Sequence, residues 1–293
     1  MKSVFIAADV ERLLTDALRS DANFTIVNTL ADAEVLITRA FIKVDRAMID
    51  AAPKLEVLAQ GTSGIDNIDL DAVRDRGVTL IHLPGVNANS VVELVIGNMI
   101  ALTRTIPFYT GQVADGVFDR TDCMTRHELS YFTLGIIGLG NVGSRLAKLA
   151  SAFGMRVVAY DPYITDFGIA KRADSLIELI AASEIITLHV PLTDETRKMI
   201  AARELAMMKR GTIVINASRG EVLDTEAALA SLVDHNHLGG LALDVFDPEP
   251  PRHPLPHDPR LILTPHIAGC TAESKTAAGV KLYEKLVEFY QTR

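Results

Sequence analysis

The sequence predicts an α/β protein of two doubly wound domains, each built on a mainly parallel sheet. Short β-branched runs alternate with amphipathic helical stretches, this alternation occurs in two separate series, and the strand-like runs are mostly continuous apolar stretches without strict alternation. Continuous apolar runs indicate strands that helices cover on both faces. The length of 293 residues suits about two domains, and a hydrophobic share of 48% is enough for packed cores.

The strand-like segments fall into two groups along the chain. The first group consists of residues 4–8, 35–38, 55–59 and 78–82, with a helical candidate at residues 44–52. The second group consists of residues 134–137, 156–160, 185–190, 212–216, 241–245 and 261–263. The second group alone is large enough for a complete dinucleotide-binding fold.

Three segments outside these groups complete the organisation. Residues 90–106 are helical by composition and apolar on more than one face, which is typical of a helix buried between domains or subunits. Residues 110–127 show little periodicity and predict a loop-like arm or crossover. Residues 271–291 predict a last helix that returns to the first domain, so the domains are not expected to be simply consecutive.

Composition excludes several classes of protein. Lys and Arg number 29 against 37 Asp and Glu, and this net charge of −8, without a basic cluster, gives no footprint for nucleic acid. The apolar run at residues 91–103 is shorter than the roughly 20 residues that span a bilayer, and the N-terminus does not resemble a signal peptide. Two cysteines form no disulfide framework or metal-ligand pattern. We expect a soluble, cytoplasmic protein with no metal and no nucleic-acid or membrane partner.

A glycine-rich turn predicts a dinucleotide cofactor. Gly138, Gly140 and Gly143 form a GxGxxG pattern between a strand and a helix. The first glycine permits a tight turn, the second lets a pyrophosphate approach the backbone, and the third lets helix and strand pack closely. The pyrophosphate would lie at the helix N-terminus, at Asn141 and Val142, where N–H groups and the helix dipole favour an anion. The context is that of a Rossmann fold.

An aspartate supports this reading and selects between the two nicotinamide dinucleotides. Asp161 ends the next strand, 18 residues after Gly143, where its carboxylate can accept hydrogen bonds from ribose hydroxyls. A 2′-phosphate would face that negative charge. The sequence therefore predicts NAD as the cofactor.

Three later segments end strands on the side where an open α/β sheet binds its ligands. They read NASRG, LDVFDPEP and TPHIAG. They supply the guanidinium of Arg219, the carboxylates of Asp244 and Glu249, and the imidazole of His266. Each of these residues taken singly has an ordinary structural explanation, as a helix cap, a loop charge or a strand-end histidine.

Taken together, in this order after the glycine turn, these segments closely resemble the D-isomer-specific 2-hydroxyacid dehydrogenase family. The resemblance extends over nearly the whole chain and includes the loop GTSGIDNID at residues 61–69 and HVPLT at residues 189–193. It implies a flavodoxin-like substrate domain of residues 1–96 plus 270–293. A Rossmann NAD-binding domain of residues 97–269 would be inserted in it.

The resemblance implies a catalytic trio of Arg219, Glu249 and His266, with Asp244 holding the nicotinamide carboxamide. A planar guanidinium suits a 2-oxo acid, because it can contact both the carboxylate and the ketone oxygen. An imidazole changes charge near neutral pH and can deliver the proton that must arrive as hydride reaches C2. A carboxylate on the other ring nitrogen would orient the imidazole and favour its charged form.

The remaining ligand contacts also follow from the resemblance. The loop of Thr62, Ser63 and Gly64 follows a predicted strand, and its backbone N–H groups form a candidate concavity for the substrate carboxylate, with a plain glycine turn as the alternative. Arg39 is a further candidate anion contact. Gln60 stands where many phosphoglycerate dehydrogenases place an arginine, which weakens the case for a phosphate pocket. Further cofactor contacts are expected from His189, Val190, Pro191, Ala217 and Ser218.

The predicted function is an NAD-dependent oxidoreductase, similar to phosphoglycerate dehydrogenase or hydroxypyruvate reductase, that interconverts a small D-2-hydroxy acid and its 2-oxo acid. Glyoxylate, hydroxypyruvate, phenyl- or alkyl-substituted oxo acids and 3-phosphohydroxypyruvate all remain open as substrates. The family also implies a homodimer. The alternatives are an NAD-sensing interaction protein similar to the C-terminal-binding corepressors, with little turnover, and a domain pair that has lost its activity.

Overall fold

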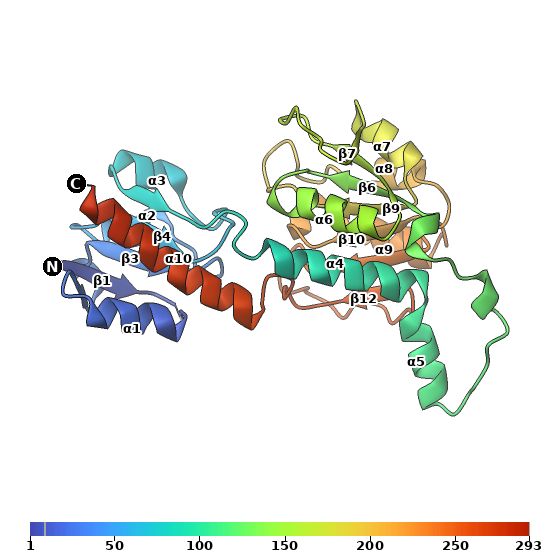
Figure 1. The fold of residues 1–293 in the computed structure, drawn as a ribbon, viewed down its shortest axis with the longest axis horizontal. Helices are drawn as coiled ribbons and strands as arrows, with labels where there is room; N and C mark the ends of the chain where they lie inside the picture. Colours follow the sequence, from blue (N-terminus) through green and yellow to red (C-terminus); the bar gives the residue numbers. More distant parts are fainter. Residues whose placement is uncertain (9, 293) are drawn as a thin grey trace. The chain divides into compact units, whose positions relative to one another are not determined.

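The computed structural model describes residues 1–8 and 10–292, which form two compact units. One unit comprises Met1–Asn87 and Cys270–Arg293, and the other comprises Ala88–Gly269. Each contains a parallel sheet with helices on both faces, which confirms the predicted fold class (Figure 1). The first boundary between the two units lies after Asn87, whereas it was predicted after residue 96. The whole of helix α4 (Ala88–Thr103) belongs to the second unit.

In the first unit the described residues form a five-stranded parallel sheet of order β2-β1-β3-β4-β5, which is the flavodoxin-like order. The strands are β1 (Lys2–Ile6), β2 (Phe24–Ile26), β3 (Val35–Thr38), β4 (Val57–Gln60) and β5 (Thr79–Ile81). Strand β2 was not predicted. It is three residues long and lies at the sheet edge with one buried residue, as does the predicted strand β5, so length and burial do not set it apart.

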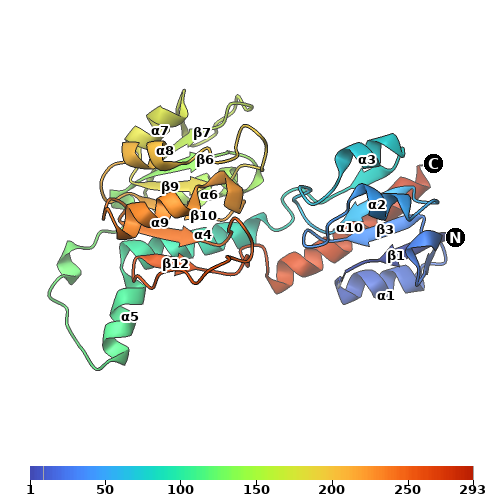
Figure 2. The ribbon, with the colours of Figure 1, turned by 180° about the vertical axis from the view of Figure 1, so that it is seen from behind.

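Helices cover both faces of this sheet (Figures 1 and 2). They are α1 (Arg12–Ser20), α2 (Arg46–Asp50), α3 (Leu70–Asp75) and α10 (Ala272–Gln291), with the 3₁₀ turn η1 (Leu30–Asp32). Leu282 and Leu286 of α10 lie in the same buried cluster as Leu14 and Leu18 of α1. The last helix therefore returns to the first unit, as the sequence predicts.

In the second unit the described residues form a seven-stranded parallel sheet of order β12-β11-β10-β9-β6-β7-β8. The strands are β6 (Thr133–Ile137), β7 (Arg156–Tyr160), β8 (Lys171–Arg172), β9 (Ile185–Leu188), β10 (Ile213–Asn216), β11 (Gly240–Leu243) and β12 (Leu261–Leu263). The order reverses between β6 and β9, which is the Rossmann switch point. Strand β8 was not predicted, because it consists of two exposed basic residues.

Helices also cover both faces of the second sheet. The helices of this unit are α4, α5 (Ile106–Ala114), α6 (Asn141–Ala152), α7 (Leu176–Ala182), α8 (Ala202–Met207) and α9 (Thr225–Val233), with 3₁₀ turns η2 (Cys123–Thr125), η3 (Leu129–Tyr131) and η4 (Gly220–Val222). Helices α4 and α6 lie on one face and α7, α8 and α9 on the other (Figures 1 and 2). The apolar residues of α4, among them Val95 and Met99, are buried in the core of their own unit. The expectation that this helix also lies between domains or subunits stays a prediction.

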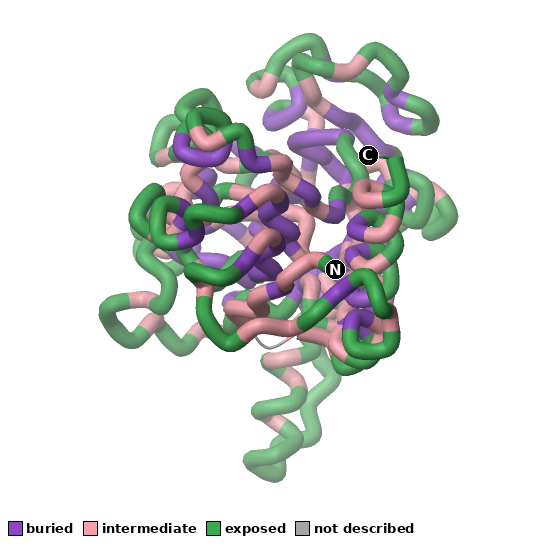
Figure 3. Tube along the Cα trace, turned by 90° about the vertical axis from the view of Figure 1, so that its left-hand side faces the viewer, coloured by how far each residue is buried: buried purple, intermediate pink, exposed green. Residues whose placement is uncertain are grey.

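The expectation of a loop over residues 110–127 was wrong in part, because α5 occupies Ile106–Ala114. This helix contains no buried residue (Figure 3). Because no face of it packs into the core, its sequence lacks the apolar periodicity by which a helix is recognised. It begins after Thr105, whose φ of 47° is left-handed, and it is bent by 63° from α4. Within the described residues no single helix is long and apolar enough to cross a membrane, although this bent pair meets the test of length and composition.

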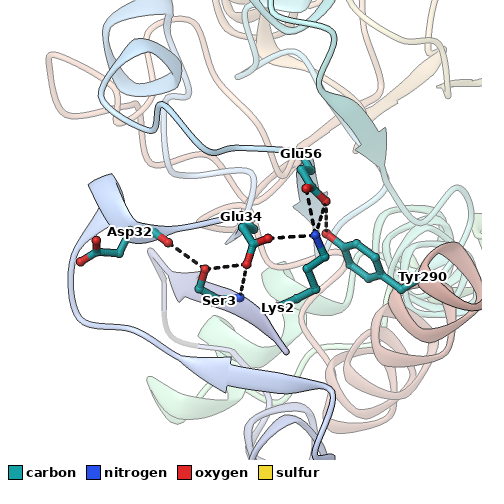
Figure 4. A network of polar contacts seen from close by, with 6 residues as sticks. All are labelled: Lys2, Ser3, Asp32, Glu34, Glu56 and Tyr290. Atoms are coloured by element: carbon teal, nitrogen blue, oxygen red, sulfur yellow. Dashed lines mark hydrogen bonds and ion pairs between the residues drawn. The ribbon is translucent and has the colours of Figure 1, made fainter. Parts of the chain in front are cut away.

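A polar network ties the amino ends of three neighbouring strands to the last helix (Figure 4). Lys2 Nζ lies 2.8 Å from Glu34 Oε1 and 2.9 Å from Glu56 Oε1. The N–H and hydroxyl of Ser3 both donate to Glu34 Oε2 at 2.9 Å, and the hydroxyl of Tyr290 donates to Glu56 Oε2 at 3.3 Å. The network holds β1, β3, β4 and α10 together at the edge of the sheet opposite the strand ends that carry the predicted ligand loop.

The charge of Glu34 makes part of this stability depend on pH. Burial opposes its ionisation, but hydrogen bonds from Lys2 and Ser3 outweigh that effect and lower the pKa of Glu34 from 4.5 to about 2. A lowered folded-state pKa stabilises the protein fully above the unfolded value, and this contribution is lost as pH falls from 4.5 towards 2. We expect Glu34→Gln to lower the free energy of unfolding by about 1–2 kcal/mol at pH 7.

The measurement is denaturant unfolding from pH 7 down to pH ~3, where the difference between wild type and Glu34→Gln should shrink. Asp16→Asn is the matched control, because Asp16 pairs with Arg12 at 3.4 Å on an exposed helix face and should change little. A Glu34→Gln difference that stays constant with pH would contradict the charge-based account.

Candidate active site

The three glycines of the turn after β6 have different surroundings, close packing at two of them and open space at the third. A Cβ added to Gly138, whose φ is 89°, would lie 2.6 Å from the carbonyl oxygen of His189. A Cβ on Gly143 would lie 2.1 Å from the oxygen of Gly138, whereas a Cβ on Gly140 would meet nothing within 4 Å. The fold itself thus requires the first and third glycines. The second faces open space, which is what the close approach of a pyrophosphate needs.

The start of α6 and the end of β7 complete this cradle. Helix α6 begins at Asn141, and no side chain caps it, so its first-turn N–H groups are placed for an anion. Asp161 Oδ2 accepts a hydrogen bond from the N–H of Leu139 at 2.9 Å, and Oδ1 accepts one from the N–H of Tyr163 at 3.0 Å. The carboxylate is therefore held beside the turn with lone pairs to spare for ribose hydroxyls. These residues fit a dinucleotide.

A contact that sequence reasoning missed joins two loops beside this cradle. The hydroxyl of Tyr163 donates to Glu195, linking the loop after β7 to the loop after β9 across the end of β6. This hydrogen bond raises the pKa of Tyr163. Thr196 Oγ1 donates to the carbonyl of Pro191 at 2.6 Å and orders the second loop. No local sequence pattern predicts this contact, because Tyr163 and Glu195 are 32 residues apart.

His189 and Val190 lie against the glycine turn. His189 Nε2 is 2.9 Å from Thr187 Oγ1, and desolvation by burial lowers the pKa of His189 to about 4, so the ring is neutral near pH 7. The His189 carbonyl and the Val190 side chain are the atoms that a Cβ on Gly138 would strike. These contacts give His189 a supporting place in the structure.

Two expected cofactor contacts are apolar side chains at the carboxyl edge of the second sheet. Val142 in the first turn of α6 and Ala217 after β10 are both partly buried. Both pack against the buried cluster beneath α4 and α6. Their side chains thus contribute to the core, and only the exposed atoms of these two residues could contact a ligand.

The loop that carries Arg219 is held by a buried amide. Asn216, 1% exposed at the end of β10, accepts hydrogen bonds from the N–H and hydroxyl of Ser218 at 3.1 and 2.9 Å and donates to the Arg219 carbonyl at 2.9 Å. Arg219 Nη1 donates to the Ser218 carbonyl at 2.7 Å. A Cβ on Gly220 would lie 1.9 Å from the oxygen of Phe246, so only glycine permits this loop to lie against the loop after β11.

The structure brings Glu249 and His266 into direct contact. His266 Nδ1 lies 2.7 Å from Glu249 Oε1, and the side chains are 43% and 40% exposed. Where the carboxylate is ionised it only accepts hydrogen bonds, so Nδ1 carries the hydrogen in this contact. Arg219 follows β10, which pairs with β11, and His266 follows β12 on the far side of β11. The predicted trio thus stands on the ends of three adjacent strands.

Asp244, expected on the nicotinamide carboxamide, lies beneath the turn that carries His266. It is 1% exposed. Its Oδ1 accepts hydrogen bonds from Thr264 Oγ1 at 2.6 Å and from the N–H of Ile267 at 2.8 Å, and its Oδ2 accepts one from the N–H of Ala268 at 2.8 Å. The sequence named Asp244 but did not reveal these partners.

The expected substrate contacts Thr62, Ser63, Gly64 and Arg39 belong to the first unit, where they follow β4 and β3. The Thr62 carbonyl accepts a hydrogen bond from the N–H of Leu83 at 3.1 Å. Among the described residues, by contrast, no acceptor engages the N–H groups of Thr62, Ser63 or Gly64. The loop therefore has donors to offer an anion.

Gln60 supports this loop from within the unit. It is fully buried, and its Nε2 donates to the carbonyl of Gly64 at 3.1 Å and to Asn67 Oδ1 at 2.8 Å. The glutamine that replaces the arginine of many phosphoglycerate dehydrogenases thus holds the loop itself. The Arg39 guanidinium lies 5.7 Å from the centre of the Phe41 ring.

The described ranges contain no group of three or more His, Cys, Asp or Glu residues that could hold a metal ion. Cys123 and Cys270 are exposed free thiols.

Comparison with known proteins agrees with this geometry. The family model "D-isomer specific 2-hydroxyacid dehydrogenase, NAD binding domain" matches residues 96–268. D-3-phosphoglycerate dehydrogenase of Methanocaldococcus jannaschii is 38% identical over 267 residues, covering 89% of this chain and 50% of the relative. Hydroxypyruvate reductase of Thermotoga maritima is 36% identical over 265 residues, covering 89% and 86%. The chain thus spans half the length of the phosphoglycerate dehydrogenase and most of the reductase.

Among solved structures, D-lactate dehydrogenase from Aquifex aeolicus, complexed with NAD and lactic acid, is similar to this chain. The TM-score is 0.88 at 27% identity, and the match covers 99% of this chain and 96% of that one. The likeness extends across both units, since almost the whole chain is matched.

The glycine turn gives a paired prediction. Gly140→Ala should leave thermal stability unchanged, because its Cβ meets no neighbour, yet weaken NADH binding by about tenfold or more where the pyrophosphate approaches. Gly143→Ala should instead lower the midpoint of thermal unfolding by roughly 5 °C or more, because its Cβ meets the Gly138 carbonyl. NADH fluorescence titration and thermal unfolding of both variants check this. Unchanged NADH affinity in Gly140→Ala would show that the cofactor does not approach this turn.

Proposed function

The chain belongs to the D-isomer-specific 2-hydroxyacid dehydrogenase family, and on that premise we propose that it is an NAD-dependent oxidoreductase that interconverts a small D-2-hydroxy acid and its 2-oxo acid. The observation that carries the proposal is the contact of 2.7 Å between His266 Nδ1 and Glu249 Oε1. It lies at the carboxyl edge of the same sheet whose central strand leads into the dinucleotide-binding turn. An oriented acid–base group beside a cofactor cradle is what this reaction requires.

Arg219 is the proposed ligand of the substrate's carboxylate and ketone oxygen. Its planar guanidinium offers paired donors that match a 2-oxo acid and polarise the carbonyl. Asn216 and Ser218 hold the backbone on either side of it through the hydrogen bonds described above. Arg219 is therefore positioned before substrate arrives, which lowers the ordering cost of the reactive geometry.

His266 is the proposed acid and base. With Nδ1–H held by Glu249, the imidazolium donates its Nε2 proton to the ketone oxygen as negative charge develops there. In the oxidation direction Nε2 accepts the hydroxyl proton. When bound at the glycine turn, the nicotinamide group supplies or accepts the hydride at C2. Glu249 stabilises the charged ring and fixes its orientation.

The substrate class proposed is a small 2-oxo acid, with Thr62, Ser63, Gly64 and Arg39 as further anion contacts. The support for the loop is its set of N–H groups without protein acceptors in the described chain. The named relatives act on phosphoglycerate and hydroxypyruvate, according to their names. Glyoxylate, hydroxypyruvate and 3-phosphohydroxypyruvate are therefore the first acids to test.

The first prediction is that the wild type oxidises NADH with one or more of glyoxylate, hydroxypyruvate, phenylpyruvate, pyruvate and 3-phosphohydroxypyruvate. We expect His266→Ala to lower kcat/KM by about 10²-fold or more, because it removes the proton donor. His257→Ala is the matched control, since His257 is also exposed in this part of the chain and should retain turnover. NADH absorbance follows both.

Tight NADH binding without turnover on any of these acids would overturn the proposal. That result would favour the NAD-sensing interaction protein similar to the corepressors. Equal rates in wild type and His266→Ala would leave the reductase standing but remove His266 from its mechanism.

We also propose that the protein self-associates through α5 and the segment after it. The exposed apolar residues there are Ile106, Phe108, Val113, Val117, Phe118 and Met124. Such a concentration of exposed apolar side chains is uncommon on a monomer and is typical of an interface. A second copy of the chain is the partner that the family resemblance favours.

Introducing charge on this helix tests the interface. Phe108→Asp and Val113→Asp together should convert a dimer to a monomer of about half the mass, because desolvating the new carboxylates opposes association. Thr110→Asp, at an exposed polar position of the same helix, should not. Light scattering after size exclusion measures the mass. A wild-type monomer, or a dimer in all variants, would contradict this interface.

A further inference from the structure

The backbone of His266 adopts a conformation that an isolated chain would rarely choose. Its φ is 54°, in the left-handed region, and it is not a glycine. Side chains in this region crowd the following carbonyl, so a histidine stays there only where its surroundings enforce it. Contacts with neighbouring groups must therefore stabilise the left-handed backbone of His266, the residue proposed to carry the proton.

The groups that hold it come from the buried aspartate beneath it. The N–H of His266 donates to the backbone carbonyl of Asp244 at 2.7 Å, and the N–H groups of Ile267 and Ala268 donate to opposite oxygens of the Asp244 carboxylate. Thr264, at the start of the turn, donates a hydrogen bond from Oγ1 to the same carboxylate at 2.6 Å. Both sides of the left-handed residue are therefore fixed to one side chain.

Thr264 is itself fixed in register. Its N–H donates to the carbonyl of Leu243 at 3.0 Å, continuing the pairing of β11 with β12 by one residue. Its hydroxyl thus faces Asp244 at a place set by the sheet. Without this hydroxyl, the buried Asp244 carboxylate would keep only its hydrogen bonds from Ile267 and Ala268 and would lose part of its stabilisation, so the hydroxyl acts on the turn through Asp244.

We propose that Thr264 and Asp244 form a positioning pair that sets the left-handed turn of His266 and thereby brings its Nδ1 to Glu249. The inference rests on the proposed role of His266 as acid and base, and neither member of the pair needs to touch substrate. Thr264 and Ile267 occupy Oδ1, and Ala268 takes one of the lone pairs of Oδ2. One lone pair of Oδ2 is left, which is compatible with a further hydrogen bond from a nicotinamide carboxamide.

The test replaces the hydroxyl and leaves the carboxylate in place. Thr264→Val removes the donor with little change in volume, Thr264→Ala removes it without a branched methyl group in case the valine variant does not fold, and Thr264→Ser restores it. We expect kcat to fall about tenfold or more in the first two variants, with the NADH dissociation constant within about twofold of wild type. Thr264→Ser should recover kcat to within about threefold.

A readout independent of turnover separates the inference from the proposed function. The Nδ1–H proton of His266, held by Glu249, should give a downfield NMR signal in wild type and Thr264→Ser that is lost or moved in Thr264→Val and Thr264→Ala. His266→Ala assigns the signal. If His266→Ala retains full turnover, the proposed function of His266 fails, while the NMR comparison still decides whether Thr264 positions the ring.

Two results would overturn the inference. One is wild-type kcat together with an unmoved Nδ1–H signal in folded Thr264→Val and Thr264→Ala. The other is a rise of the NADH dissociation constant with kcat and the signal unchanged, which would give the Asp244 region a role in cofactor binding alone.

Discussion

The constraint on which the site depends is the satisfaction of two polar side chains buried at the ends of neighbouring parallel strands. Asn216 ends β10 and Asp244 follows β11, and each is 1% exposed. Burying such groups is costly unless hydrogen bonds replace those lost to water. The groups that donate hydrogen bonds to these buried side chains lie in the loops that continue from β10 and β12. These loops must therefore take the conformations that satisfy the buried groups, and Arg219 and His266 are carried on them.

Close backbone packing extends this constraint from one loop to the next. Gly220 lies so near the Phe246 carbonyl that a Cβ would be 1.9 Å from its oxygen, which joins the Arg219 loop to the segment leading to Glu249. The order β12-β11-β10 places all three loops side by side. A guanidinium, a carboxylate and an imidazole are thus presented from rigid elements, and such support is what keeps reacting groups within the narrow tolerance of catalysis.

The central strands that sequence reasoning found share an apolar run that is buried on both faces. The exposed basic strand β8 and helix α5, which has no buried residue, lack such a run and were missed. The edge strand β2 was also missed, although it is as short and as little buried as β5, which was found. Helix α4 was recognised as buried, and the structure shows that its apolar residues pack into the core of its own unit. Apolarity shows that a face is covered, but the partner that covers it is decided by packing, here by the core beneath α4 and α6.

The sequence by itself determined the fold class, the glycine turn and the acidic residue that ends the next strand, because each is a local pattern with a local physical cause. The candidate catalytic groups, with Glu249 beside His266, came from the family resemblance. Only the tertiary structure shows this contact and pairs Thr264 with Asp244. Glu249 and His266 are 17 residues apart, and Thr264 and Asp244 are 20 apart. Their contacts follow from strand register and from the need to pair a buried carboxylate, and no local pattern encodes either.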